Sequence, residues 1–155
     1  AIATFKGASK RLEKLTSTKK AVVYKDYAHS PSKVSATTKA VKAQFANRNL
    51  IACLELHTYS SLNAEFLAEY KNALDAADQA VVFYSPKAIQ IKQLEKIDEQ
   101  QIFEAFDRKD LQVFTDPNAF QEFLKAKHFQ NDVLLLMSSG NYGGLDFNEV
   151  KKWVQ

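Results

Sequence analysis

Five short apolar runs, rich in β-branched and aromatic residues, recur along the chain and alternate with segments of helical spacing. Most of the runs are continuous rather than alternating, which is typical of strands buried on both faces of a sheet. The runs cover residues 21–24, 50–56, 80–84, 111–114 and 133–137. Strands that alternate with helices predict βαβ units, a parallel sheet and right-handed crossovers.

Residues that favour helix N-caps precede most of the helical segments. Apolar side chains three and four positions apart follow each of these starts and predict helices with one buried face. The predicted starts are Ser30-Pro31, Asn63, Asp98, Asp116-Pro117 and Asp146. The segment 85–96 has no clear periodicity, and it predicts no element.

A basic segment before the first apolar run predicts one further strand. Residues 11–15 and 20–25 are able to form a hairpin around 16–19, which adds an antiparallel edge. We therefore predict an α/β fold for residues 1–155: one Rossmann-like three-layer domain with about five parallel strands plus one antiparallel edge strand. Residues 1–19 would form a junction and the edge strand, and residues 20–155 the βαβ core.

The 155-residue length suits one such domain, and the ordinary composition excludes a disordered chain. The chain begins at Ala1 without an initiator Met, so we expect a domain excised from a longer protein. The charge is uneven. Residues 1–50 contain 11 Lys and Arg against 2 acids, a net +9, whereas residues 51–155 have a net −6. This asymmetry predicts that the first third meets an anion.

The sequence lacks the signals of several kinds of site and partner. Cys53 is the single cysteine, which excludes an intrachain disulfide and favours a reducing, cytoplasmic location. No apolar run approaches the ~18 residues of a membrane helix, and no nucleic-acid-binding signature appears. We therefore expect no membrane partner and no nucleic-acid partner. The HExxH, GxSxG and phosphate-loop motifs are also missing, and we expect no metal site in this chain.

In a parallel α/β sheet, ligands bind beyond the carboxyl ends of the strands, and three such segments carry polar side chains. Residues 26–31 place a carboxylate, a phenol and an imidazole before a helix. Residues 57–62 combine an imidazole with hydroxyls, and Glu55 just before them is an edge or functional carboxylate. Residues 138–144 hold three of the four glycines of the chain. Each segment is also compatible with a simple capped turn or loop.

Taken together, these segments resemble the C-terminal domain of the Mur ligase family, the ATP-dependent amide-forming enzymes of bacterial cell-wall synthesis. Residues 5–13 (FKGASKRLE) resemble the family's FxGxxRRxE junction, and residues 26–31 (DYAHSP) its DYAHxP motif. The segment around His57 resembles FxPHxxS, although Leu56 replaces the usual proline. Residues 137–144 (MSSGNYGG) are closer to the MSNGGFGG loop of the muropeptide-recycling branch than to the MGAGD loop of the L-alanine-adding branch.

This resemblance implies a three-domain ligase that joins a peptide or amino acid to UDP-N-acetylmuramate in peptidoglycan recycling or biosynthesis. ATP and Mg²⁺ would be used by the complete enzyme, with the metal ligands in the middle domain, and this domain would be inactive alone. Its partners would be its own N-terminal and central domains. The residues implied to bind ATP are Arg11, Asp26, Tyr27 and His29. Those implied to bind the amino component are His57, Thr58, Ser60, Ser138, Ser139, Gly140 and Asn141.

Two alternatives stay open at this point. One is the C-terminal domain of the L-alanine-adding ligase, although that branch carries arginine where this chain has Thr58. The other is a non-catalytic α/β module that binds a nucleotide or a protein partner. A receiver-like module would need clustered acids at the strand ends, and only Asp26 meets that requirement clearly.

Overall fold

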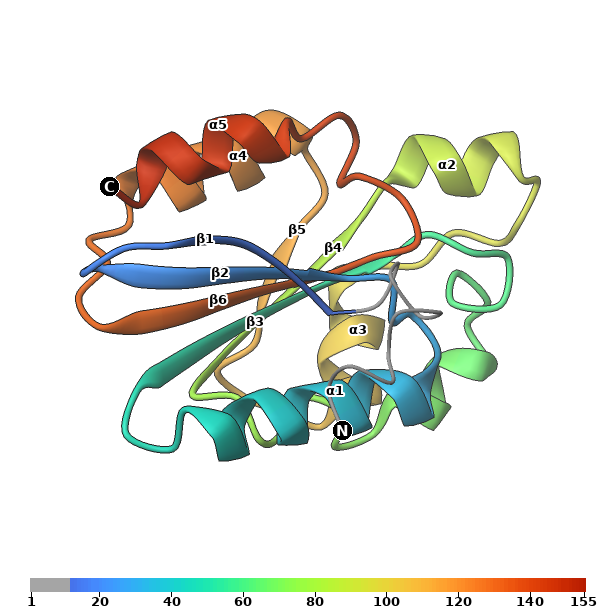
Figure 1. Ribbon diagram of the computed structural model, residues 1–155. Helices are drawn as coiled ribbons and strands as arrows, with labels where there is room; N and C mark the ends of the chain where they lie inside the picture. Colours follow the sequence, from blue (N-terminus) through green and yellow to red (C-terminus); the bar gives the residue numbers. More distant parts are fainter. Residues whose placement is uncertain (1–11) are drawn as a thin grey trace.

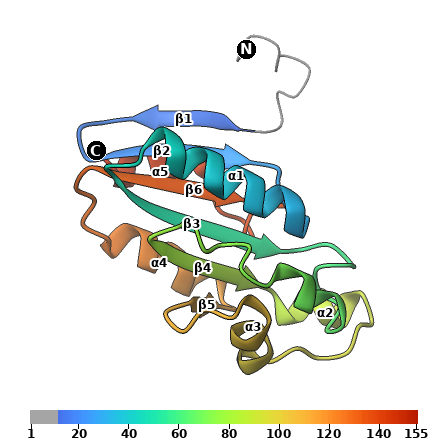
Figure 2. The same cartoon turned by 90° about the horizontal axis from the view of Figure 1, so that it is seen from below.

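The computed structural model describes residues 12–155, which form one mixed sheet of six strands flanked by helices (Figure 1). The strand order is β1-β2-β6-β3-β4-β5, which Figure 2 shows from below. Within residues 12–155, β1 and β2 pair antiparallel, and the other neighbouring strands are parallel. The strands are β1 (Glu13–Ser17), β2 (Ala21–Asp26), β3 (Asn49–Leu56), β4 (Gln79–Tyr84), β5 (Gln112–Phe114) and β6 (Asp132–Met137). The predicted fold class is confirmed.

Helices cover both faces of this sheet, as three layers require. One face packs against α1, the 3₁₀ helix η2 and α3, and the other against α4 and α5. The helical elements are α1 (Pro31–Gln44), η2 (Phe66–Tyr70), α2 (Pro86–Ile91), α3 (Glu99–Phe106), α4 (Pro117–Ala126) and α5 (Phe147–Trp153). No helix among residues 12–155 is both long and apolar enough to cross a bilayer.

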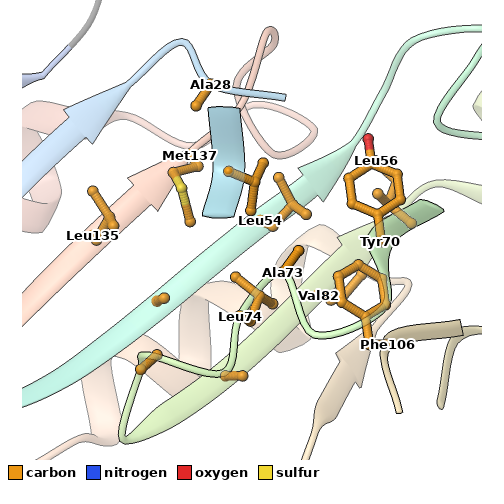
Figure 3. Close-up of a cluster of buried hydrophobic side chains, with 14 of the residues drawn as sticks. Ala28, Leu54, Leu56, Tyr70, Ala73, Leu74, Val82, Phe106, Leu135 and Met137 are labelled. Atoms are coloured by element: carbon orange, nitrogen blue, oxygen red, sulfur yellow. The ribbon is translucent and has the colours of Figure 1, made fainter. Parts of the chain in front are cut away.

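Two hydrophobic clusters follow from the alternation of side chains along each buried strand. In β3, Leu54 and Leu56 point into the larger cluster, while Cys53 points into the smaller cluster on the opposite face. Figure 3 shows the larger cluster, in which Tyr70 of η2 stacks on Phe106 of α3 with ring centroids 5.3 Å apart. The continuous apolar runs are therefore double-sided strands, as their pattern predicted.

Four of the five predicted helix starts are confirmed, and in three of them the predicted residue caps the helix with its side chain. The side chains of Asp98, Asp116 and Asp146 accept backbone N–H bonds at the starts of α3, α4 and α5. Ser30 stands at the N-cap of α1, but its side chain makes no capping bond, and Pro31 supplies the helical start instead.

The prediction of an α-helix after Asn63 was wrong, because a short 3₁₀ helix forms there instead. Asn63 does accept from the N–H groups of Glu65 and Phe66, but only the five-residue 3₁₀ helix η2 follows. Asn72 has a left-handed φ of +64° and donates its N–H to the carbonyl of Phe106, so the chain turns away before a longer α-helix is able to form.

Two other boundaries differ from the prediction. The segment 85–96, predicted to be irregular, contains α2, which Ser85 caps by accepting from the Ala88 N–H. The serine–proline pair there is the same start signal as at α1, but the helix is too short to show periodicity. Strand β1 also extends to Ser17, beyond the predicted hairpin strand, with an irregularity in its register near Lys14.

Candidate functional site

Polar side chains gather where the central strands β2, β6 and β3 end, at the carboxyl edge of the sheet. Asp26 and Met137 are paired at the ends of β2 and β6, and the Ser138 N–H donates to the Asp26 carbonyl at 3.0 Å. Strand β3 lies on the other side of β6 and ends one residue before His57. The predicted candidate segments therefore do adjoin one another, as the topological rule requires.

The first group of predicted residues lies in the loop from β2 to α1. Asp26 is 3% exposed, and its Oδ1 accepts the Ala28 N–H at 3.2 Å, which closes a tight turn. Tyr27 is 49% exposed, and its ring meets the ring of His29 edge-on at 5.4 Å. The His29 Nδ1 lies 3.0 Å from the Tyr27 carbonyl.

A hollow of about 150 Å³ lies beside this loop. Asp26, Tyr27 and His29 line it from the loop, and Lys33 lines it from the first turn of α1. Sequence reasoning missed Lys33, because a single lysine near a helix start gives no signal of its own. The Tyr70 hydroxyl of η2 donates to the His29 carbonyl, which fixes the back of the loop. Burial raises the pKa of Tyr70 well above its usual value, so this hydroxyl stays protonated and a donor.

The second group is organised by Glu55, which is 3% exposed and stands in central strand β3 rather than at an edge. Its Oε1 accepts the Ser138 hydroxyl at 2.6 Å and the Tyr142 N–H at 2.8 Å. Its Oε2 lies 3.6 Å from Nδ1 of His57, beyond hydrogen-bond length but within ion-pair range. A buried carboxylate thus ties the β3 end to the loop after β6. The sequence signal for it was a lone acid inside an apolar run.

The glycine loop packs directly against these side chains. A Cβ built on Gly140 would lie 3.1 Å from His57 Cδ2 and 3.2 Å from Glu55 Oε1, so only glycine fits without displacement. The Gly140 N–H donates to the Ser138 Oγ at 2.7 Å. Glu55, Ser138, Gly140 and His57 therefore form one connected cluster, which we call the Glu55 cluster.

Tyr142 anchors the other end of this loop in the smaller hydrophobic cluster. It is fully buried with a φ of +56°, and its ring stacks on Phe120 of α4 at 4.9 Å. Its hydroxyl lies within hydrogen-bond distance of the carbonyls of Cys53 and Met137. Burial, with further contributions from Cys53 and Glu55, raises the pKa of Tyr142 well above 10. The phenol is therefore a neutral structural donor.

Four other predicted residues lie near the Glu55 cluster without joining it. Thr58 and Ser61 bond to each other within the turn after β3. Ser60 instead lines a separate hollow of about 430 Å³ beside η2. Asn141 is exposed, and its Oδ1 accepts the Gly144 N–H, which shapes the loop.

The last of these four is Ser139, whose Oγ is buried and has no hydrogen-bond partner among residues 12–155. A buried hydroxyl without a partner is a group that a bound polar ligand is able to satisfy. The predicted phosphate-binding residue, Arg11, lies outside the described residues, as does most of the junction motif around it.

The two groups lie on opposite faces of the sheet. Asp26 shares the face of Val22 and Tyr24, which belong to the larger cluster and pack toward α1. Glu55 shares the face of Cys53, which belongs to the smaller cluster beneath α4 and α5. A ligand that touched both groups would have to span the carboxyl edge of β6. Two adjacent subsites at one sheet edge suit two reactants better than one small ligand.

Among residues 12–155, no three His, Cys, Asp or Glu side chains come close enough to hold a metal ion.

Comparison with known proteins gives matches over most of the chain. Residues 10–140 match the family model described as "Mur ligase, glutamate ligase domain". A UDP-N-acetylmuramate–L-alanine ligase from Gloeothece citriformis is 33% identical over 147 residues, which cover 90% of this chain and 29% of that protein. The chain thus spans under a third of that relative's length.

Two solved structures share the fold at lower identity. A murein peptide ligase from Psychrobacter arcticus superposes with a TM-score of 0.71 at 18% identity, covering 94% of this chain and 30% of that one. A UDP-N-acetylmuramate–alanine ligase from Thermotoga maritima gives a TM-score of 0.60 at 16% identity, covering 97% of this chain and 34% of that one. At these identities, the likeness establishes the fold and not the substrate.

Proposed function

The chain belongs to the Mur ligase family, and we propose that it is the C-terminal domain of an ATP-dependent ligase that joins an amino component to UDP-N-acetylmuramate. In this proposal the domain works together with N-terminal and central domains of the same enzyme. It supplies one wall for ATP and one for the incoming amine. The observation that carries the proposal is the pair of adjacent polar subsites at the carboxyl edge of the sheet, beside the ends of β2, β6 and β3.

The β2–α1 loop is proposed to hold the nucleotide. A carboxylate suits a ribose diol, and Asp26 lines the hollow that Tyr27, His29 and Lys33 share. Arg11 is proposed to reach the phosphates, because a guanidinium matches phosphate oxygens in geometry and charge. ATP would transfer its γ-phosphoryl group to the lactyl carboxylate of the UDP-sugar, with ADP as the leaving group. The amine then attacks the resulting acyl phosphate, which forms the amide and releases phosphate.

The Glu55 cluster is proposed to face the amino component. His57, Ser138 and Gly140 belong to that cluster, and Ser139 contributes a buried hydroxyl that has no partner among residues 12–155. Thr58, Ser60 and Asn141 are proposed to line the rim, because their contacts lie within turns or toward solvent. Domain closure would bring the two walls onto the reactants, a common way to complete a site.

The amino component is proposed to be a muropeptide-derived tripeptide, L-alanyl-γ-D-glutamyl-meso-diaminopimelate. Support comes from the MSSGNYGG loop of residues 137–144 and from the fold likeness to a murein peptide ligase. L-Alanine is the second candidate, because the Gloeothece citriformis relative is named as an L-alanine ligase. The family assignment favours either ligase over a non-catalytic module.

The test is a ligase assay with the longest natural protein that carries this chain. Phosphate release would be measured with UDP-N-acetylmuramate, ATP and either the tripeptide or L-alanine. We expect turnover with the tripeptide, and turnover with L-alanine alone would assign the other branch. We also expect Asp26→Ala to raise the KM for ATP far more than the KM for the UDP-sugar. Equal effects on both constants would refute the ribose role.

The isolated 155-residue chain provides a second test. Because the activating step is proposed to need other domains, we expect no ligase or ATPase turnover and at most weak ATP binding. Calorimetric titration and the phosphate-release assay would measure both. Robust turnover by the chain alone would contradict the proposal that the site is shared among domains.

A further inference from the structure

The Glu55 carboxylate is held in one position by its own hydrogen bonds. The Tyr142 N–H and the Ser138 hydroxyl both donate to Oε1, and the side chain is 3% exposed in the middle of the sheet. Oε1 is therefore occupied, and rotation of the carboxylate would strand a buried N–H. Oε2 is left facing Nδ1 of His57 at 3.6 Å.

The imidazole of His57 has one inward edge and one outward edge. Nδ1 faces Glu55, while Cγ and Cδ2 lie against Gly140, where a Cβ would approach within 3.1–3.2 Å. Nε2 and Cε1 are therefore the ring atoms on the outward edge, and the side chain is 43% exposed. A ligand at the carboxyl edge of the sheet would meet Nε2 first.

We infer that Glu55 is a positioning residue that holds His57 in the Nδ1–H tautomer, so that Nε2 accepts a hydrogen bond from the amino group of the incoming substrate. The carboxylate oxygen Oε2 lies 3.6 Å from Nδ1, and at that distance it attracts an N–H on Nδ1 and repels a lone pair there. The neutral ring has just one N–H, which leaves Nε2 as an acceptor. This inference rests on the proposed function for the identity of the ligand, but not for the tautomer.

The negative charge of Glu55 also favours the amino group of the substrate at this position. An ammonium group offers only donors, and it is attracted by a buried anion behind the ring. A substrate carboxylate at the same place would meet a lone pair on Nε2 and a negative charge beyond it. The amine of the amino component, and not its carboxylate, is therefore the group assigned to His57.

The substitution Glu55→Gln tests the roles of the two carboxylate oxygens independently. The Tyr142 N–H and the Ser138 hydroxyl still require an acceptor, so the glutamine oxygen takes the Oε1 position. Its NH₂ group then faces Nδ1 of His57 and favours a lone pair on that nitrogen. The proton of the neutral imidazole moves to Nε2, while the bonds that hold the loop remain.

The tautomer is measured by ¹⁵N NMR of the histidine rings in the 155-residue chain, in alkaline solution where imidazoles are neutral. The His57 signals are assigned by their loss in His57→Gln. We expect protonated Nδ1 in the unmodified chain and protonated Nε2 in Glu55→Gln. Ser138→Ala, which removes one Oε1 bond and leaves Oε2 in place, should keep the original tautomer. Protonated Nε2 in the unmodified chain, or no change in Glu55→Gln, would overturn the inference.

The substrate end is tested by steady-state kinetics of the complete ligase. We expect Glu55→Gln to raise the KM for the amino component about 10- to 100-fold, as for one hydrogen bond to a charged group. The KM for ATP should stay unchanged, and Glu122→Gln on the surface of α4 serves as the control. A tautomer switch without a rise in this KM would refute the amine assignment. If the unmodified enzyme has no ligase activity, the proposed function fails, and the NMR result still decides the role of Glu55.

Discussion

Removing the Glu55 side chain should destabilise the domain far more than removing its charge alone. Glu55→Ala deletes the acceptor of the Tyr142 N–H and of the Ser138 hydroxyl, at 2.8 and 2.6 Å. The hydroxyl is able to rotate toward another acceptor, but the amide of fully buried Tyr142 is fixed. Glu55→Gln keeps an acceptor in the Oε1 position, so its bonds to the loop survive.

The magnitude follows from these contacts. An orphaned buried N–H costs about 1–3 kcal/mol, and a lost hydrogen bond to a charged group about 1.5–3 kcal/mol. Removing a buried charge returns part of this cost. We expect a net loss of about 2–4 kcal/mol for Glu55→Ala, which lowers the Tm by roughly 10 °C in a domain of this size. Glu55→Gln should stay within about 1 kcal/mol of the unmodified chain.

Urea unfolding, followed by fluorescence of the single tryptophan, Trp153, measures the free energies, and calorimetry measures the Tm. Ser138→Ala, which leaves the Tyr142 amide its acceptor, should fall between the two Glu55 variants. Glu122→Gln on the solvent-facing side of α4 should be neutral within about 0.5 kcal/mol. Equal stability of Glu55→Ala and Glu55→Gln would refute the reasoning, because the acceptor at Oε1 would then contribute nothing.

Three further outcomes test other parts of the fold. Gly143→Ala should cost about 2–4 kcal/mol in urea unfolding, because its φ is +73° and the new Cβ would lie 2.7 Å from Pro117 Cγ; a neutral effect would contradict the packing of this loop on α4. Burial raises the pKa of Cys53 to about 12, so a thiol reagent near pH 8 should react only after urea unfolding, and rapid labelling of the native chain would place Cys53 at the surface. Burial tends to raise the pKa of Asp78, but bonds from the Leu50 N–H and from Lys42 outweigh it and lower that pKa below 3.8. A carboxyl group whose pKa is lower in the folded than in the unfolded state stabilises the fold at pH values above its unfolded pKa, and this stabilisation is lost as the pH falls through its folded pKa. The difference in stability between the unmodified chain and Asp78→Asn should therefore shrink below about pH 4. A difference that does not depend on pH would rule out this linkage.

Local signals in the sequence were sufficient for most of the fold. Apolar runs buried on both faces identified the parallel strands, and Asp98, Asp116 and Asp146 marked true helix starts. These signals work because capping and burial act within a few residues. They failed where a tertiary contact decided the outcome, as at Asn72, whose N–H bonds to the distant carbonyl of Phe106.

The sequence likewise predicted some features of the candidate site, and the tertiary structure decided the others. Residue types and strand ends were enough to place Asp26, His57 and Ser138 at one sheet edge, because parallel strands carry their carboxyl ends to the same side. Only the tertiary structure decided that Asp26 and the Glu55 cluster occupy opposite faces of that edge, because the facing depends on the register of β2, β6 and β3. It also decided the place of Glu55. A lone acid in an apolar run gives no sign of its partners, and those partners, Ser138 and Tyr142, come from a loop more than eighty residues away.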